Sequence, residues 1–155
     1  MATTKRYFYS NEFYHIILRG IDGKTLFLND QDYFRMINGM FVFNDKGLIG
    51  SSFRHKGCPN DRFERKRKGP LVNIHAFCLM PNHIHFLLEQ KVEGGLSKFM
   101  LKIGAGYAAF FNNKYKRKGH LFQSRFKSVL IKDDDQLAVI FSYIHTNPVS
   151  IIEPN

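Results

Sequence analysis

Cysteine is scarce in this chain of 155 residues, which contains only Cys58 and Cys78. Two cysteines without a Cys-x-x-Cys motif fall short of a disulfide framework, so we expect the protein to reside in a reducing compartment. The opening residues, MATTKRYFYSNEFYH, lack the apolar stretch that a signal peptide needs, and no apolar run reaches membrane-spanning length. We therefore expect a cytoplasmic protein without a membrane partner.

Acidic residues are also scarce, and one long segment has none. The chain has 23 Lys and Arg against 13 Asp and Glu, a formal net charge of +10. Residues 94–132 contain no Asp or Glu, while basic and aromatic residues interleave there. Such one-sided charge repels itself unless an anion binds, and the interleaved aromatics are typical of proteins that bind single-stranded nucleic acid.

Repeats and low-complexity tracts are absent, and the length fits a single domain over residues 1–155. The segment at about 50–70, GSSFRHKGCPNDRFERKRKGP, is rich in Gly, Ser and charge. We interpret it as a flexible basic loop, because the pieces on either side are too short to fold alone.

The spacing of apolar residues predicts an α+β domain. Alternation predicts strands, and helical periodicity predicts helices that begin and end at Asn, Asp or Pro signals. The short connection at Pro81 and Asn82 predicts a hairpin. We expect an antiparallel β-sheet with helices packed mainly on one face. The predicted strands are 13–20, 71–80, 83–91 and 127–132, with a short extended piece within 20–30, and the predicted helices are 31–44, 95–118 and 133–147.

The stretch LMPNHIHFLLEQ places His83 and His85 two positions apart in a predicted strand. Their imidazoles then share one face of the sheet, while Ile84 and Phe86 point to the other. Two converging imidazoles on a rigid strand suit a divalent cation, although a pair of satisfied polar side chains would show the same spacing. Nearby His75 is better explained as a hydrogen-bonded structural or supporting histidine.

The last predicted helix carries an apolar stripe of Leu137, Ile140, Phe141 and Ile144. Tyr143 and Asn147 lie four residues apart on its flank, almost one above the other. Tyr143 can pack against the sheet while its hydroxyl reaches an open site, or it can be an ordinary tyrosine at the margin of the core. Asn147 can equally be no more than a helix cap before Pro148.

One further motif, GAGYAA at 104–109, mimics a dinucleotide fingerprint but follows a helical pattern instead of a strand. We interpret its small residues as permitting close helix packing, within the chain or across a dimer.

Taken together, HAFCLMPNHIHFLLE and the later YIHTNPV resemble the single-tyrosine HUH transposases, in which HUH denotes His, a hydrophobic residue and His. The REP-associated and insertion-sequence-200-like groups are the most similar. YHIILRGIDGKTLFLND and GHLFQSRFKSVLI also fit that family, so the resemblance covers nearly the whole chain. It implies a ferredoxin-like, RRM-like HUH nuclease domain from a mobile element.

The resemblance also implies roles for individual residues. Tyr143 would be the nucleophile, and His83, His85 and Asn147 would hold Mg²⁺ or Mn²⁺. Such an enzyme cleaves and rejoins single-stranded hairpin DNA through a covalent 5′-phosphotyrosine, and we expect a homodimer whose subunits can share active sites. Alternatives are a non-catalytic, domesticated protein that binds structured nucleic acid, and a metal-dependent nuclease that uses water. The expected DNA contacts are Arg19, Lys114, Lys116, Arg117, Lys118, Arg125 and Lys127.

Overall fold

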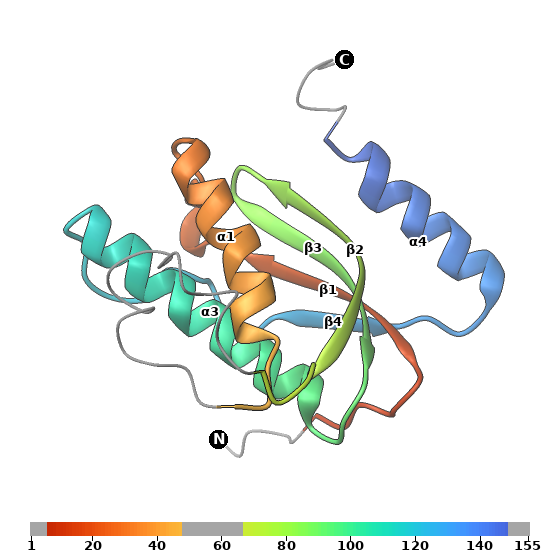
Figure 1. Ribbon diagram of the computed structural model, residues 1–155. Coiled ribbons are helices and arrows are strands. Elements are labelled where there is room, and N and C mark those ends of the chain that lie inside the picture. Colours follow the sequence, from red (N-terminus) through yellow and green to blue (C-terminus); the bar gives the residue numbers. More distant parts are fainter. Residues whose placement is uncertain (1–5, 48–66, 149–155) are drawn as a thin grey trace.

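The computed structural model describes residues 6–47 and 67–148, which build a four-stranded sheet with antiparallel strand pairs (Figure 1). The order across the sheet is β2-β3-β1-β4. The predicted hairpin is confirmed, and the predicted basic loop lies almost wholly outside the described residues. The strands are β1 (Phe13–Arg19), β2 (Val72–Met80), β3 (His83–Gln90) and β4 (Lys127–Leu130).

The two longest helices, α1 (Asp30–Phe43) and α3 (Gly95–Lys114), cover one face of the sheet, and α4 (Asp134–Thr146) lies over the other face (Figure 1). The prediction of an α+β domain with helices mainly on one face is confirmed. Within residues 6–47 and 67–148, no helix has the length and apolar character that a membrane crossing requires.

One predicted element is wrong. The segment after β1 does not extend but turns as a short 3-10 helix, η1 (Ile21–Gly23). The Lys24 N–H donates to the Ile21 carbonyl at 2.8 Å, and Asp22 has a φ of 50°, so this stretch is a closed turn. The Gly and Asp residues that signal a turn outweigh the apolar residues that follow them.

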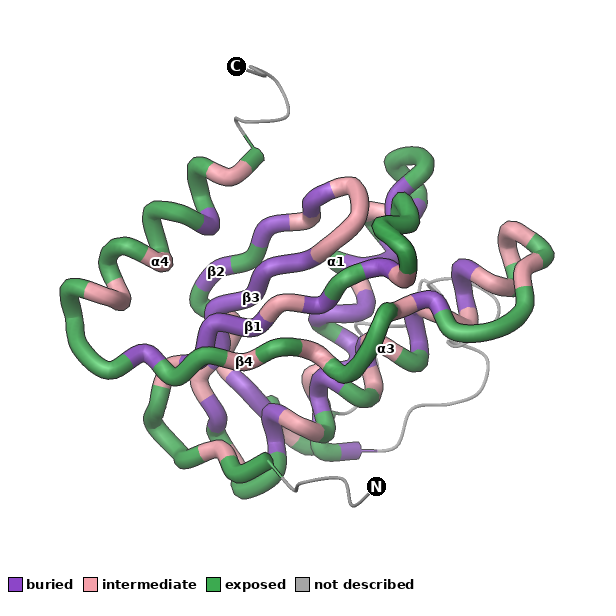
Figure 2. The backbone as a smooth tube through the Cα atoms, turned by 180° about the vertical axis from the view of Figure 1, so that it is seen from behind, coloured by how far each residue is buried: buried purple, intermediate pink, exposed green. Residues whose placement is uncertain are grey.

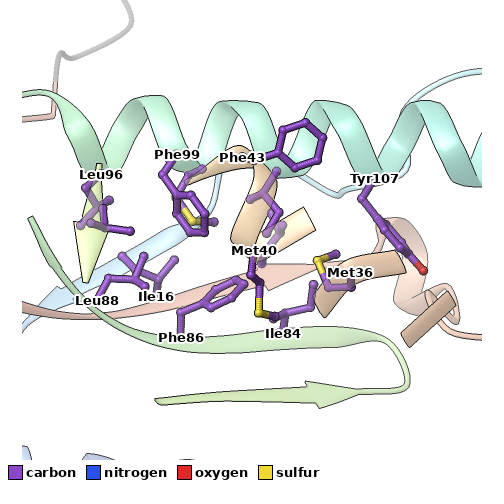
Figure 3. Close-up of a cluster of buried hydrophobic side chains, with 14 of the residues drawn as sticks. Ile16, Met36, Met40, Phe43, Ile84, Phe86, Leu88, Leu96, Phe99 and Tyr107 are labelled. Carbon is purple, nitrogen blue, oxygen red and sulfur yellow. The ribbon is translucent and has the colours of Figure 1, made fainter. Parts of the chain in front are cut away.

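The main hydrophobic core fills the space between the sheet and the pair α1 and α3 (Figure 3). A smaller apolar cluster lies on the other face, beneath α4. Figure 2 shows that most of α4 is exposed, and Ile144 is its one fully covered residue. The smaller cluster consists of Ala76, Cys78, Met80, Leu87, Ile131 and Ile144, with Phe13, Leu137 and Ile140 packed against it.

Strand β2 changes phase in its middle. Its register against β3 shifts between Ile74 and Ala76, which marks a β-bulge at His75. Val72 before the bulge belongs to the main core, whereas Ala76 and Cys78 after it belong to the smaller cluster. One strand therefore contributes apolar side chains to both faces of the sheet.

Close contact between α1 and α3 depends on Gly106, the second glycine of the GAGYAA motif. A β-carbon added there would lie 2.6 Å from Cε2 of Phe43 and closer still to Cζ. Phe43 is buried beside α3 (Figure 3), so its ring has little room to move. The predicted close helix packing is thus confirmed, and it occurs within the chain.

We expect Gly106→Ala to lower the free energy of unfolding by about 2 kcal/mol, because overpacking outweighs the gain in helix propensity. Gly104→Ala is the matched control, since a β-carbon at Gly104 meets nothing within 4 Å. That variant should gain up to about 1 kcal/mol from helix propensity alone. Urea unfolding of both variants measures the difference, and equal shifts would contradict this account of the α1–α3 contact.

Candidate active site

The candidate site lies on the face of the sheet that α4 covers, at the start of β3. The turn at Pro81 and Asn82 leads directly into this strand. Ile84 is fully buried in the main core, and because side chains alternate along a strand, His83 and His85 lie on the opposite face. The ring centroids of His83 and His85 are 4.8 Å apart. The predicted side-by-side pair is confirmed.

Both imidazoles have one nitrogen engaged at Nδ1. The Nδ1 of His83 is 2.7 Å from Oδ1 of Asn82, and that of His85 is 2.9 Å from Nε2 of His15. The Nε2 of His85 is buried and has no hydrogen-bond partner among the described residues. An unsatisfied buried nitrogen of this kind fits a metal ligand, because a cation would supply the missing partner.

The electrostatic environment keeps the pair neutral. Burial lowers the pKa of His85 to about 4, with help from the nearby His83, His15 and Arg19. Burial, followed by the charge of Arg19, also lowers the pKa of His83. Imidazole binds metal ions only in its neutral form, so both side chains are in the state that a metal ligand needs at neutral pH.

Tyr143 comes to this pair from α4 of the same chain. Its ring centroid is 5.5 Å from that of His85 and 6.3 Å from that of His15, with both contacts edge-on. The neighbouring Ile144 is fully buried and fixes this face of the helix on the sheet. Tyr143 itself is 46% exposed, so the residue is open to solvent beside the histidines.

Helix α4 differs from its prediction at one apolar position. Phe141, expected in the buried stripe, is 45% exposed and packs on His145, with ring centroids 4.3 Å apart. The stripe is narrower than predicted because α4 covers only part of the sheet. Its predicted start is confirmed, since the Asp133 side chain accepts a hydrogen bond from the Gln136 N–H at 2.7 Å.

Asn147 follows Tyr143 by one helical turn and caps α4, with its N–H donating to the Tyr143 carbonyl at 2.9 Å. Its assignment as a third metal ligand stays a prediction. In the part of the chain that the structure describes, no group of three or more His, Cys, Asp or Glu side chains is arranged to hold a metal ion. If the two imidazoles hold a cation, a further donor from the described residues would be of another kind, such as an amide oxygen.

Two of the predicted DNA contacts flank the histidines. Arg19 ends β1 opposite His83 and is exposed, and its charge acts on both imidazoles. Lys127 begins β4, is exposed and pairs in register with Ile17 of β1. Both cations therefore lie at the edge of the candidate site.

The other predicted DNA contacts divide into two groups. Lys114 contacts Asp32 at 2.7 Å, and Arg117 donates to Asn112 and to the His120 carbonyl, so both hold the end of α3 in place. Their first role is structural, and a DNA contact by either stays a prediction. The three others, which are exposed, are Lys116, Lys118 and Arg125.

His75 lies elsewhere on the same face. Its Nε2 is 3.0 Å from Oε2 of Glu89, and its ring contacts Phe13. The hydrogen-bonded histidine expected from the sequence is confirmed, but strict alternation would place it on the face of Leu79. The β-bulge turns it to the side of Glu89 instead.

His15 is the residue of this site that sequence patterns miss. Alternation in β1 places His15 on one face with Phe13 and Ile17, but only the cross-strand register brings it to His85. The one available signal was its position in an apolar strand, where an unpaired polar side chain costs free energy.

Comparison with known proteins identifies the class to which this chain belongs. A family model described as "Transposase IS200 like" matches residues 60–147, which is more than half of the 155 residues. The chain belongs to the IS200-like transposase family.

Individual relatives agree with that family. A candidate REP-associated tyrosine transposase of Haemophilus influenzae is 31% identical over 84 residues, which are 48% of this chain and 48% of that protein. The chain thus matches about half the length of this relative.

Two solved structures share the fold. A REP-associated tyrosine transposase bound to a REP hairpin has a TM-score of 0.62 at 17% identity, covering 97% of this chain and 74% of that one. A candidate transposase from Deinococcus radiodurans has a TM-score of 0.50 at 15% identity, covering 94% and 97%.

Proposed function

We propose that this protein cleaves and rejoins single-stranded DNA, with Tyr143 as the nucleophile and His83 and His85 as ligands of a divalent cation. The observation that carries the proposal is the edge-on approach of Tyr143 to His85, at 5.5 Å between ring centroids, beside a buried Nε2 that lacks a partner. Membership of the IS200-like family supports it.

The reaction needs no external energy source. The Tyr143 hydroxyl oxygen attacks the scissile phosphorus, the bond to the 3′ oxygen breaks, and that oxygen leaves as a hydroxyl after taking up a proton. The 5′ phosphate stays on Tyr143 as a phosphodiester, and the phenol proton passes to solvent. A second 3′ hydroxyl then reverses the step on another end, which joins two strands and restores the tyrosine.

The donor set decides which cation suits the site. A bound divalent cation supplies Lewis-acid polarisation of a phosphate oxygen. Mn²⁺ accepts imidazole more readily than Mg²⁺, which prefers oxygen ligands. We therefore expect Mn²⁺ to support cleavage at least as well as Mg²⁺ when each is titrated against labelled DNA. Activity with Zn²⁺ alone would contradict this ligand assignment.

A path for the DNA strand runs from the site around the β4 edge. Gln123 N–H donates to the Arg19 carbonyl at 2.9 Å, which ties the segment before β4 to the candidate site. A pocket of about 930 Å³ opens between this segment and α3, and none of the described residues that line it is acidic. Its walls include Leu101 and Phe126, with Arg6 and Arg125 beside them, which suits bases and phosphates together.

The test is a denaturing gel of the protein with single strands from its own genomic flanks, labelled at the 5′ or the 3′ end, in Mn²⁺. Attack by Tyr143 should leave the 3′-labelled fragment on the protein and release the 5′-labelled fragment free. Cleaved DNA without attached protein would indicate a nuclease that uses water. Binding without cleavage under any metal would indicate the non-catalytic alternative.

The position of Tyr143 beside the histidines of its own chain supports action within one subunit. Sharing of active sites in a homodimer stays a prediction, and so does the cytoplasmic location.

A further inference from the structure

His15 lies at the back of the candidate site, where it contacts both of the groups that the proposed function requires. It is 7% exposed, and its ring is nearly parallel to that of His85, with an interplanar angle of 15° and centroids 5.1 Å apart. The edge-on contact with Tyr143 completes its surroundings on the α4 side. His15 is thus packed between the two elements that carry the site.

The 2.9 Å contact between Nε2 of His15 and Nδ1 of His85 contains one proton when both rings are neutral, and two arrangements are possible. In the first, His15 donates and the His85 proton sits on Nε2. That N–H would then be buried without an acceptor among the described residues, which is costly. A protonated Nε2 would also have no lone pair to offer to a cation. In the second, His85 donates from Nδ1, and its Nε2 presents a lone pair.

The second arrangement matches what the neighbouring imidazole does. The amide oxygen of Asn82 can only accept, so His83 donates from Nδ1 at 2.7 Å and keeps its own lone pair on Nε2. Both histidines of the pair then offer the same nitrogen. The tautomer of His83 therefore favours the second arrangement for His85, in which the proton lies on Nδ1 and points to His15.

We propose that His15 is a positioning residue that accepts the Nδ1 proton of His85, fixes its tautomer and directs its Nε2 lone pair toward the cation. The inference rests on the metal site of the proposed function. Metal-binding histidines usually donate to a carboxylate, a backbone carbonyl or water. A neutral imidazole in that place orients the ligand without adding negative charge to a buried centre.

The experiment compares three variants of the full chain without DNA. His15→Phe keeps an aromatic ring but removes the acceptor, and His15→Gln supplies an amide oxygen near the place of the lost Nε2. His120→Phe is the matched control, because His120 is exposed in the segment that follows α3. Mn²⁺ affinity is measured by calorimetry and by the electron paramagnetic resonance signal of the free ion.

We expect His15→Phe to weaken Mn²⁺ binding by about 10- to 100-fold, the usual effect of losing such a partner. His15→Gln should stay within about threefold of the natural protein, and His120→Phe should match it. Nitrogen-15 spectra of the histidine rings provide a readout that a merely structural role would not move. His85 should carry its proton on Nδ1 in the natural protein and lose that preference in His15→Phe.

The outcomes separate this inference from the proposed function. Equal Mn²⁺ affinity of the natural protein and His15→Phe would overturn the inference and leave the metal site intact. A proton on Nε2 of His85 in the metal-free natural protein would also overturn it. A natural protein that binds no Mn²⁺ would overturn the metal site itself, and the inference with it.

Discussion

Replacing Tyr143 with phenylalanine should reduce formation of the covalent protein–DNA adduct by about a thousandfold or more, because the variant lacks the attacking oxygen. The phenylalanine ring can keep the edge-on contacts with His85 and His15, at 5.5 and 6.3 Å between centroids. Folding and DNA affinity should therefore change little. The measurement is the fraction of labelled DNA that remains on the protein in a denaturing gel.

The control is Tyr9→Phe, since Tyr9 is 66% exposed and precedes Ser10, which bridges to Gln90 at the opposite end of β3 from His83. That variant should form the adduct at the natural rate. An undiminished adduct in Tyr143→Phe would place the nucleophile on another residue and reject the proposed role.

Two other tyrosines are poor replacements, which sharpens the test. The Tyr107 hydroxyl donates to the Leu26 carbonyl at 2.6 Å in the main core, and burial raises its pKa well above the usual range. The Tyr115 hydroxyl donates to Asp32 at 2.7 Å. Both belong to the side of the sheet that α1 and α3 cover, so neither competes for a phosphate beside His85.

Replacing Asp32 with asparagine should lower the free energy of unfolding by about 3 kcal/mol at neutral pH, the scale for breaking a buried ion pair. Asp32 is fully buried at the start of α1 and accepts from Lys114 and Tyr115 at 2.7 Å each and from the Leu28 N–H at 2.8 Å. It therefore joins the beginning of α1 to the end of α3. Urea unfolding measures the loss.

Acid provides a second test of the same carboxylate. Burial alone would raise the pKa of Asp32, but hydrogen bonds from Lys114, Tyr115 and Leu28, with the charge of Lys114, outweigh it and lower the pKa below its ordinary value of 3.8. A lowered pKa means stabilisation that is complete above about 3.8 and is lost as the pH falls through the folded-state value. The gap between the natural protein and Asp32→Asn should therefore narrow in acid.

The control for Asp32 is Asp30→Asn, in the same first turn of α1 but exposed. It should cost no more than about 1 kcal/mol, the effect of one exposed charge near a helix start. Equal losses in the two variants, or a gap that stays constant down to pH 3, would contradict the role of the Asp32–Lys114 pair.

Local patterns predict most of the fold because neighbours in sequence decide it. The turn at Pro81 and Asn82 and the alternation around it predict the β2–β3 hairpin, and Asp133 predicts the start of α4. The His83 and His85 pair follows from strand geometry alone. These features need no knowledge of what packs against them.

Two of the features that sequence patterns miss depend on contacts between distant segments. His15 reaches His85 across 70 positions of sequence, which only the β1–β3 register establishes. Phe141 is exposed because α4 covers only part of the sheet, and a helical wheel carries no information about the extent of the surface opposite. The face of His75 depends on a single irregularity in β2.

Because of that irregularity, β2 contributes apolar side chains to both hydrophobic clusters. Val72, Ile74, Ala76, Cys78 and Met80 stand at every second position and in an unbroken strand would all face one way. With one extra residue in the middle, the strand divides this row between the two faces of the sheet. Cys78 and Met80 pair in register with His85 and His83. They form part of the apolar surface on which α4 packs. The helix that carries Tyr143 therefore rests partly on apolar side chains of β2 whose face is set by the β-bulge at His75, ten residues before His85 in the sequence.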